Sequence, residues 1–326
     1  MSGVNVAIIG LGVISKTHIE AIDSYGANLV AVCDIKEEKI QKFGCAKYTD
    51  YRELLKRDDL DIVHICTPHY LHAQMTIDSA NAGKHVLVEK PASTKTEQVI
   101  KMIENKNGKK VCVCFQNRYN QGTIMAKDII DKKIYGDILG VYALVPWYRN
   151  DEYYTKSDWR GKLSTEGGCL LVNQAIHTID LMQYLVGEVE TVKAHVDNYT
   201  HEGIIEGEDT ATAALYYKSG IIGMFFGTNC YNSGSTTQIE IKFENATLNL
   251  TEKGLFVNNE LVIENGEICK AKSYYGNSHS TLIHELYDEI LCRGGSSISI
   301  EEALPACRII EAIYESSNKN EKIHIL

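Results

Sequence analysis

The sequence predicts an α/β protein with two domains, a doubly wound parallel sheet followed by an α/β domain with a large, mainly antiparallel open sheet. Apolar, β-branched runs alternate with helical patterns through the first third of the chain, which indicates a parallel sheet covered on both faces. Strand-like runs with short turns dominate from Asp137 onward, which indicates antiparallel neighbours. A chain of 326 residues favours two domains, and we place the boundary so that they comprise residues 1–120 and 121–326.

The elements of the first domain alternate regularly, and right-handed crossovers between parallel strands give a doubly wound fold. The expected strands are NVAII (5–9), LVAVC (29–33), IVHIC (62–66), HVLVE (85–89) and KVCVCF (110–115). The expected helices cover residues 15–25, 36–43, 51–57 and 71–82, and a further helix opens at Thr94 with a capping box to Glu97.

A glycine-rich turn follows the first strand. Residues 10–15 read GLGVIS, which is the GxGxxG pattern with serine at the third glycine. In a doubly wound sheet, ligands bind beyond the carboxyl ends of the strands, and the helix that follows offers free N–H groups to a pyrophosphate. We therefore expect cofactor contacts from Gly10, Gly12, Val13 and Ile14. A structural glycine turn that binds no ligand is the alternative.

The acidic residue after the second strand indicates which dinucleotide fits. Asp34 ends that strand, where a carboxylate accepts hydrogen bonds from a ribose diol and repels a 2′-phosphate. NAD is therefore the expected cofactor, and NADP is less favoured. Lys36 and Lys39 lie nearby in the sequence and partly offset that repulsion.

The most apolar helical pattern in the chain contains three polar residues. It covers residues 166–187 (EGGCLLVNQAIHTIDLMQYLVG), and its apolar side chains cover nearly every side, which predicts a buried helix. Asn173, His177 and Asp180 share one stripe of this helix. Because buried polar groups need partners, we expect the stripe to line a cleft where cofactor and substrate supply them. A core histidine with one internal hydrogen bond is the alternative for His177.

Further motifs make a family resemblance specific. They are TPHYLH (67–72), EKP (89–91), QNRY (116–119) and YYGNSH (274–279). With the string G-G-x(4)-N-x-x-x-H-x-x-D at 167–180, they resemble the Gfo/Idh/MocA family of sugar-type oxidoreductases along essentially the whole chain. The resemblance implies an N-terminal Rossmann domain and a C-terminal domain for substrate binding and oligomerisation. It also implies that the substrate lies between the two domains, against the nicotinamide.

The resemblance assigns catalytic residues as well. It implies that Lys90 of EKP and His177 are catalytic, and that the peptide bond before Pro91 is cis. Family members often carry Asp and Gly where this chain has Asn173 and Ala175. Because an amide cannot act as a base, proton transfer then rests on His177 and Lys90. The Asn-Gln pair at 173–174 resembles a subgroup acting on nucleotide-linked or N-acetylated sugars.

The chemistry of these side chains agrees with hydride transfer. Oxidising a secondary alcohol removes the hydroxyl proton while the carbon gives hydride to nicotinamide, and histidine suits that proton transfer near neutral pH. Lys90 can stabilise negative charge on the alcohol oxygen, with a solvated end-of-strand lysine as the alternative. Asn173 could orient the ring of His177 or bind a neighbouring hydroxyl. Asp180 could fix the tautomer of that ring or bind backbone.

The remaining candidates follow from their positions at strand ends and in loops. Aromatic rings and arginines gather just before the two glycines, which suits sugar stacking and hydroxyl binding, although an ordinary structured loop is the alternative. The histidines show no paired ligand spacing, so no metal is expected. The cofactor-side candidates are Thr67, Pro68, His72, Glu89, Lys90, Gln116 and Arg118, and the substrate-side candidates are Tyr148, Arg149, Tyr153, Trp159, Arg160 and His279.

The second domain is expected to combine a large sheet with the long helix on one face. Its other face then needs cover, which predicts a homodimer or homotetramer through that sheet. Helices over 282–291 and 301–316 close the chain, the second with a capping box from Ser299 to Glu302. The expected strands are residues 138–148, 189–199, 210–217, 221–229, 237–243, 246–251 and 253–259.

Bulk composition narrows the class of partner. A net charge of −10 argues against a nucleic-acid partner. No apolar run approaches the roughly 18 residues of a membrane span, so no membrane partner is expected. The first residues lack the basic segment of a secretory signal, and the ten cysteines are scattered, which is typical of reduced thiols in the cytoplasm.

These observations favour an NAD(P)-dependent dehydrogenase that acts on a secondary alcohol or ketone of a sugar, polyol or nucleotide-sugar. The first alternative is a redox-neutral enzyme that uses tightly bound NAD for transient oxidation and elimination. Copurifying cofactor without net NADH production would favour it. The second alternative is a non-catalytic NAD-dependent sensor, which the presence of both Lys90 and His177 disfavours.

Overall fold

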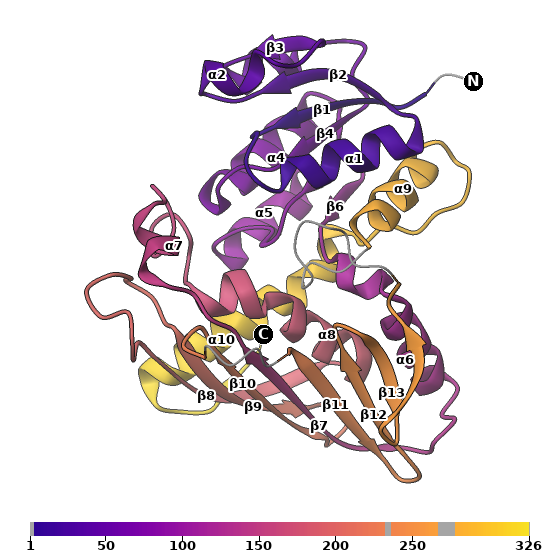
Figure 1. The fold of residues 1–326 in the computed structure, drawn as a ribbon, viewed down its shortest axis with the longest axis vertical. Coiled ribbons are helices and arrows are strands. Elements are labelled where there is room, and N and C mark those ends of the chain that lie inside the picture. The colour runs from indigo at the N-terminus through magenta and orange to yellow at the C-terminus, as the bar shows by residue number, and fades with distance from the viewer. Residues whose placement is uncertain (1–2, 232–235, 267–277, 326) are drawn as a thin grey trace. The chain divides into compact units, whose positions relative to one another are not determined.

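The computed structural model of the chain describes residues 3–231, 236–266 and 278–325. Contacts between Cα atoms divide the chain into two compact units. The first contains residues Met1–Gln116 and Ser278–Leu304, and the second contains Asn117–Asn277 and Pro305–Leu326. Each unit has its own sheet (Figure 1).

The first unit is built on a six-stranded sheet in which every neighbouring pair of strands is parallel. The strand order β3-β2-β1-β4-β5-β6 is the doubly wound arrangement that the alternating pattern predicted. The central strands β1 and β4 are buried along almost their whole length, as expected of strands enclosed on both faces. The strands are β1 (Asn5–Ile9), β2 (Asn28–Cys33), β3 (Ala46–Tyr48), β4 (Ile62–Ile65), β5 (His85–Val88) and β6 (Val111–Val113).

The helices of this unit lie within or close to the predicted stretches, whereas the edge strand β3 was not predicted. Three residues are too few to show a periodicity in the sequence. The helices before residue 116 are α1 (Ser15–Tyr25), α2 (Glu37–Ile40), α3 (Tyr51–Leu55), η1 (His69–Leu71), α4 (His72–Asn81) and α5 (Thr96–Glu104).

The capping box predicted from Thr94 to Glu97 is wrong. Helix α5 begins at Thr96, so Lys95 is its N-cap residue and no side chain caps it. The hydroxyl of Thr94 instead lies 3.5 Å from Oε1 of Gln98. The helix starts one residue later than the box requires, so Glu97 lies at the second helical position instead of the third and is too near the start to reach back.

A late segment of the chain returns to the first unit, so this unit is discontinuous where a single boundary near residue 120 was expected. Helix α9 (His279–Ile290) packs beside α1 (Figure 1). Its buried face includes Leu282, Ile283 and Leu286. Farther along, the backbone N–H of Val113 donates to the carbonyl of Ile298 at 3.0 Å. These apolar and backbone contacts fix residues 278–304 to the first unit.

The second unit is built on a nine-stranded sheet with the order β14-β13-β12-β11-β7-β10-β9-β8-β15. All neighbouring pairs are antiparallel except β7 and β10, which confirms a mainly antiparallel sheet. Parallel neighbours require a long crossover, and here it includes the long apolar helix. The strands are β7 (Ile138–Pro146), β8 (Val189–Asp197), β9 (Thr210–Tyr217), β10 (Ile222–Thr228), β11 (Gln238–Phe243), β12 (Thr247–Thr251), β13 (Gly254–Val257), β14 (Glu260–Glu264) and β15 (Ile323–His324).

Helices cover one face of this sheet (Figure 1). Along β7, Val141, Ala143 and Val145 are buried, whereas Tyr142 is exposed on the opposite face. The capping box from Ser299 to Glu302 is confirmed: the Ser299 N–H donates to Glu302 Oε2 at 2.9 Å, and the Glu302 N–H donates to the hydroxyl of Ser299 at 3.3 Å. Neither β14 nor α6 was predicted. The remaining helices are η2 (Gln116–Tyr119), α6 (Gln121–Asp131), α7 (Asp151–Thr155), η3 (Leu170–Ala175), α8 (Ile176–Val186) and α10 (Ile300–Lys319).

Within the described ranges, none of the helices has the length and apolarity that crossing a bilayer requires.

Candidate active-site residues in the two units

The two glycines of the turn after β1 have different surroundings. Gly10 has φ +90°, and a Cβ there would lie 2.7 Å from the carbonyl oxygen of Cys66, so the chain packing itself requires glycine. A Cβ on Gly12 would meet no heavy atom within 4 Å. Helix α1 follows with no side-chain hydrogen bond at its N-cap, Ile14. Open space before an uncapped helix of 11 residues suits the close approach of a phosphate group.

Asp34 ties this turn to the end of β2. Its Oδ2 accepts the backbone N–H of Leu11 at 2.8 Å, and its Oδ1 accepts the backbone N–H of Lys36 at 3.0 Å. The ammonium of Lys39 donates to Oδ2 at 3.2 Å. The carboxylate therefore positions the glycine turn, and Lys39 compensates part of its charge.

His72 holds together the loops that follow β4 and β5. Its Nδ1 lies 2.7 Å from the carbonyl oxygen of Pro91, and its Nε2 lies 2.8 Å from that of Thr67. The ring is fully buried, and burial lowers its pKa. The peptide bond between Lys90 and Pro91 is cis, as the resemblance implied. Thr67, Pro68 and Lys90 thus stand at the same carboxyl edge as the glycine turn, and Gln116 follows β6 there, almost fully buried.

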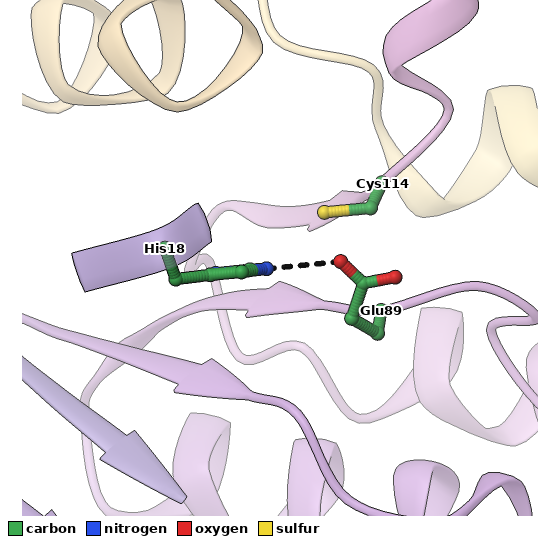
Figure 2. A group of neighbouring side chains, drawn as sticks. All are labelled: His18, Glu89 and Cys114. Carbon is green, nitrogen blue, oxygen red and sulfur yellow. Dashed lines mark hydrogen bonds and ion pairs between the residues drawn. The ribbon is translucent and has the colours of Figure 1, made fainter. Parts of the chain in front are cut away.

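A cluster of buried titratable groups lies beneath this edge, and sequence analysis missed most of it. His18 Nε2 hydrogen-bonds Glu89 Oε1 at 2.9 Å, and Cys114 stands beside the pair (Figure 2). His18 Nδ1 lies 3.0 Å from His64 Nδ1. A histidine inside the apolar strand IVHIC and another on the buried face of α1 were the available signals.

His279, which was predicted on the substrate side, lies in the interior of the first unit. It is 4% exposed, and its Nε2 is 3.8 Å from Glu89 Oε1. Burial lowers its pKa to about 4, so the ring is neutral near pH 7. The ring is enclosed because α9 packs against α1. Residues 274–277 of the YYGNSH motif lie outside the described residues.

In the second unit, the long apolar helix is continuous to Gly187 but begins as a π-helix. The segment η3 (Leu170–Ala175) has π geometry and leads directly into α8. The buried carboxyl of Glu208 accepts the backbone N–H of Leu171 at 2.8 Å and the hydroxyl of Tyr314 at 2.8 Å. A π segment shifts the helical register and is frequent at functional sites. Asn173 lies on this segment, and His177, at 8% exposure, lies in the first turn of α8.

Asp180 pairs with Arg118. The sequence had suggested instead that Asp180 fixes the tautomer of the His177 ring or binds backbone. The Nε and Nη2 atoms of Arg118 donate to the two carboxylate oxygens at 2.8 and 2.6 Å. The guanidinium also lies 4.6 Å from the ring centroid of Tyr184. Both charged groups are buried, so this bidentate pair fixes α8 to the segment after β6. Arg118, predicted on the cofactor side, has its guanidinium inside the second unit.

Asn173 is held by a buried carboxyl group that sequence analysis did not single out. Its Nδ2 donates to Glu166 Oε1 at 2.6 Å and to the hydroxyl of Tyr153 at 3.2 Å. Gln174 Nε2 donates to the same hydroxyl at 3.3 Å. Because Oε1 of Glu166 accepts this short hydrogen bond, Glu166 determines which way the amide of Asn173 points. Burial raises the pKa of Glu166 to about 7.

Two arginines flank the ring of Tyr153. The guanidinium carbon of Arg160 lies 4.4 Å from the ring centroid, and that of Arg149 lies 4.8 Å from it. Arg160 also lies 5.2 Å from the ring of Trp159. Tyr148 is 47% exposed. The segment before the glycines is therefore ordered around α7 and offers cations and aromatic rings together.

Two sets of described side chains stand close enough together to hold a metal ion: His18, Glu89 and Cys114, and His201, Asp209 and Cys230. In each set the histidine hydrogen-bonds the carboxylate directly, at 2.9 and 3.0 Å. Direct pairing satisfies both groups without a metal.

Comparison with known proteins places the chain in a family. An oxidoreductase family model with an NAD-binding Rossmann fold matches residues 4–118, and the GFO/IDH/MocA C-terminal domain model matches residues 123–249. The WlbA dehydrogenase from Bordetella pertussis, solved in complex with NADH and UDP-GlcNAcA, has a TM-score of 0.88 at 29% identity, and the match covers 99% of both chains.

Curated relatives match over a shorter length. Levoglucosan dehydrogenase of Pseudarthrobacter phenanthrenivorans is 30% identical over 62% of this chain. Inositol 2-dehydrogenase of Salmonella typhimurium is 30% identical over 58% of this chain. The match spans 56% of the length of each relative.

The two family models together match most of the chain and agree with the two sheets of the structure. They confirm the predicted fold class and the resemblance to the family. The chain belongs to the Gfo/Idh/MocA family of oxidoreductases, whose N-terminal domain is an NAD-binding Rossmann fold.

Proposed function

We propose that this protein is an NAD-dependent dehydrogenase that transfers hydride between the nicotinamide and a secondary alcohol or ketone of a nucleotide-linked sugar. The observation that supports it most is the glycine turn. Gly12 leaves open space before an uncapped helix, and Asp34 is hydrogen-bonded to the turn. Such a turn binds a dinucleotide, and the family membership of the chain supports the same chemistry.

The preference for NAD over NADP rests on Asp34. Its carboxylate is held at the end of β2 by two backbone N–H groups, so its charge cannot turn away from a ligand at that position. A 2′-phosphate there would meet this charge, which Lys39 compensates only in part. NAD is therefore the proposed cofactor.

Lys90 and His177 are the proposed catalytic residues. Bound NAD would supply the hydride acceptor. His177 takes the hydroxyl proton during oxidation and returns it during reduction, which imidazole does well near neutral pH. The Lys90 ammonium stabilises negative charge on the same oxygen. Asn173, whose amide orientation Glu166 fixes, contributes a hydrogen bond to a substrate hydroxyl.

The substrate class is proposed from the segment that precedes the two glycines. Arg149 and Arg160 flank Tyr153, so two guanidinium groups and an aromatic ring lie together. Guanidinium groups bind phosphate and carboxylate well, and aromatic rings stack on sugars and bases. The WlbA structure contains UDP-GlcNAcA, a nucleotide-linked sugar acid. We therefore propose a nucleotide-linked sugar, a sugar acid in particular, as substrate.

The test is the near-ultraviolet absorbance of NADH formed by purified protein. Nucleotide-linked sugar acids, nucleotide sugars, free sugars and inositols are offered singly with NAD or NADP. Lys90→Ala and His177→Ala are expected to lose the activity. The matched variants Lys95→Ala and His195→Ala, at exposed positions, are expected to keep it.

Two outcomes would contradict the proposal. NADH formation that survives in Lys90→Ala and His177→Ala would remove their assigned roles. Absence of NADH with every substrate, while NAD remains bound, would favour the redox-neutral enzyme or the sensor.

We also propose that the protein assembles through the nine-stranded sheet. Ile222 and Met224 on β10 are 52% and 53% exposed, and Met224 is directly paired with the exposed Tyr142 on β7. An apolar sheet face of this kind usually marks association.

A further inference from the structure

Four buried side chains of the first unit form a continuous hydrogen-bonded chain. The hydroxyl of Tyr287 lies 3.0 Å from Nε2 of His64, and Nδ1 of His64 lies 3.0 Å from Nδ1 of His18. Nε2 of His18 lies 2.9 Å from Oε1 of Glu89 (Figure 2). The four residues come from α9, β4, α1 and the end of β5. Three of them are fully buried, and Glu89 is 6% exposed.

Proton counting restricts the states of this chain. Two ring nitrogens 3.0 Å apart share one proton, so His18 and His64 cannot both donate along that contact. If His18 is an imidazolium, it donates to both His64 and Glu89, and His64 donates through Nε2 to Tyr287. If His18 is neutral, it donates only to Glu89. His64 then donates through Nδ1 to His18, and the hydroxyl of Tyr287 donates to Nε2 of His64. The geometry accommodates both arrangements.

The charges around the chain favour the imidazolium. Burial opposes a charge on His18, but the neighbouring Cys66 and Glu89 outweigh it and raise the pKa of His18 above its usual value. Burial also raises the pKa of Cys66 itself, so near neutral pH it is a thiol and Glu89 is the partner that carries charge. Burial and the charge of His18 hold the pKa of His64 well below its usual range.

Among the groups of the buried cluster that face Glu89, His18 is the main candidate to carry a positive charge. Burial lowers the pKa of His279 to about 4, so that ring is neutral. Burial raises the pKa of Cys114 well above its usual range. Burial opposes ionisation of Glu89 as well, but the hydrogen bond and charge of His18 outweigh it and hold the pKa of Glu89 well below its usual range. Both pKa shifts favour an imidazolium paired with a carboxylate.

Glu89 connects this pair to the residue that follows it. Its Oε2 accepts the backbone N–H of Lys90 at 3.2 Å, and the charge of Lys90 contributes to its low pKa. By reciprocity, an ionised Glu89 favours the charged ammonium of Lys90. The same carboxylate therefore contacts the backbone of Lys90 and acts on its charge.

We propose that His18 is a positioning residue for Lys90: its imidazolium keeps Glu89 ionised, and ionised Glu89 holds the backbone of Lys90 in place and its side chain charged. The part of this inference that concerns catalysis rests on the proposed function. The part that concerns protonation of the buried pair does not. Removing the His18 charge leaves Glu89 buried without its cation, and the carboxylate then takes up a proton.

The first test reads protonation directly and needs no substrate. Nitrogen-15 NMR of histidine-labelled protein at pH 8 is expected to show His18 doubly protonated and His64 neutral. In Glu89→Gln, His18 is expected to become neutral at the same pH. A neutral His18 in the wild-type protein, or a doubly protonated one that survives Glu89→Gln, would overturn the proposal.

The second test compares His18→Gln with His85→Gln. Gln at position 18 can donate a hydrogen bond to Glu89 but carries no charge. His85 lies at the opposite end of β5, where its Nδ1 accepts the backbone N–H of Lys110 at 3.0 Å, so the same substitution there leaves the buried pair intact. For His18→Gln we expect kcat to fall by about tenfold or more. The alkaline limb of its pH profile should move to lower pH, and KM for NAD should change by less than about threefold.

Glu89→Gln is expected to reproduce that pH shift, and His85→Gln is expected to keep the wild-type profile. A role in folding alone would lower the thermal midpoint of His18→Gln while leaving its pH profile unchanged, and that result refutes the positioning role. A wild-type protein without dehydrogenase activity would instead refute the proposed function, and the NMR result would still decide the state of the pair.

Discussion

At the scale of single residues, the two glycines of the turn after β1 differ: packing requires glycine at position 10, and the proposed binding of a pyrophosphate requires it at position 12. A methyl group at Gly10 would collide with the backbone of Cys66, whereas one at Gly12 would enter open space. The two glycines are two residues apart, and we expect substitution of each to give a different kind of defect.

Gly10→Ala is expected to lower the free energy of unfolding by about 1–3 kcal/mol, because backbone atoms must move to admit the methyl group. Gly12→Ala is expected to keep wild-type stability and to weaken NAD binding, since the methyl group occupies the space for the pyrophosphate. Thermal unfolding and calorimetric titration with NAD measure the two effects. Tight NAD binding by Gly12→Ala would contradict the assigned contact.

The free energy of unfolding is expected to depend on pH because of Glu166. Burial raises its pKa from 4.5 to about 7, so the folded protein holds this proton more tightly than the unfolded chain. Its contribution to the free energy of unfolding is therefore greatest below about pH 4.5 and falls as pH rises to about 7. The loss over that window is on the order of 3 kcal/mol.

Glu166→Gln is expected to flatten the dependence of stability on pH over that window. Chemical denaturation at pH 5 and pH 8 measures it, and Glu202→Gln, at an exposed position of the same unit, is the matched control. A slope that is equally steep in Glu166→Gln would show that this carboxyl titrates at its ordinary pKa.

At the scale of elements, the buried pair of Arg118 and Asp180 fixes α8 against the segment after β6. Removing one member leaves the other charge buried and unpaired, so Arg118→Met is expected to cost about 3–5 kcal/mol of stability. The double variant Arg118→Met with Asp180→Leu is expected to be more stable than Arg118→Met alone. Denaturant titration of the four proteins in this cycle gives the coupling energy, and strictly additive effects would argue against the pair.

The two capping boxes show how much of an element the sequence can predict. Ser299 and Glu302 make both reciprocal hydrogen bonds, whereas Thr94 and Glu97 make neither. Both pairs have the same spacing in the sequence, so spacing alone does not decide whether a capping box forms. The start of α5 depends on the loop after Pro91, which the His72 ring holds from another part of the chain. A local pattern cannot contain that information.

The long apolar helix gives a second example. Its buried character and its end at Gly187 follow from composition and from a glycine with φ +117°. Its π-helical start does not, because the Glu208 carboxyl that holds the N–H of Leu171 comes from a distant segment. The partner of Asp180 was missed for the same reason: Arg118 is 62 residues away in the sequence.

At the scale of the whole molecule, the uncovered sheet face leads to a prediction about assembly. Met224→Glu places a charge among apolar side chains and is expected to shift the protein toward monomer, while Lys319→Glu, at the end of α10, is expected to leave assembly unchanged. Light scattering at micromolar concentration measures the mass. A wild-type monomer under these conditions would contradict assembly through this face.

The sequence by itself determined the fold class, the strand and helix pattern of most of the chain, the glycine turn, and the motifs that contain Lys90 and His177. These features are local, because the periods of strands and helices and the demands of a tight turn are set by neighbouring residues. Only the tertiary structure decided that residues 278–304 join the first unit, that Glu166 holds Asn173, and that His18 pairs with Glu89. Each of these depends on burial that brings distant residues together, and burial also sets their charges.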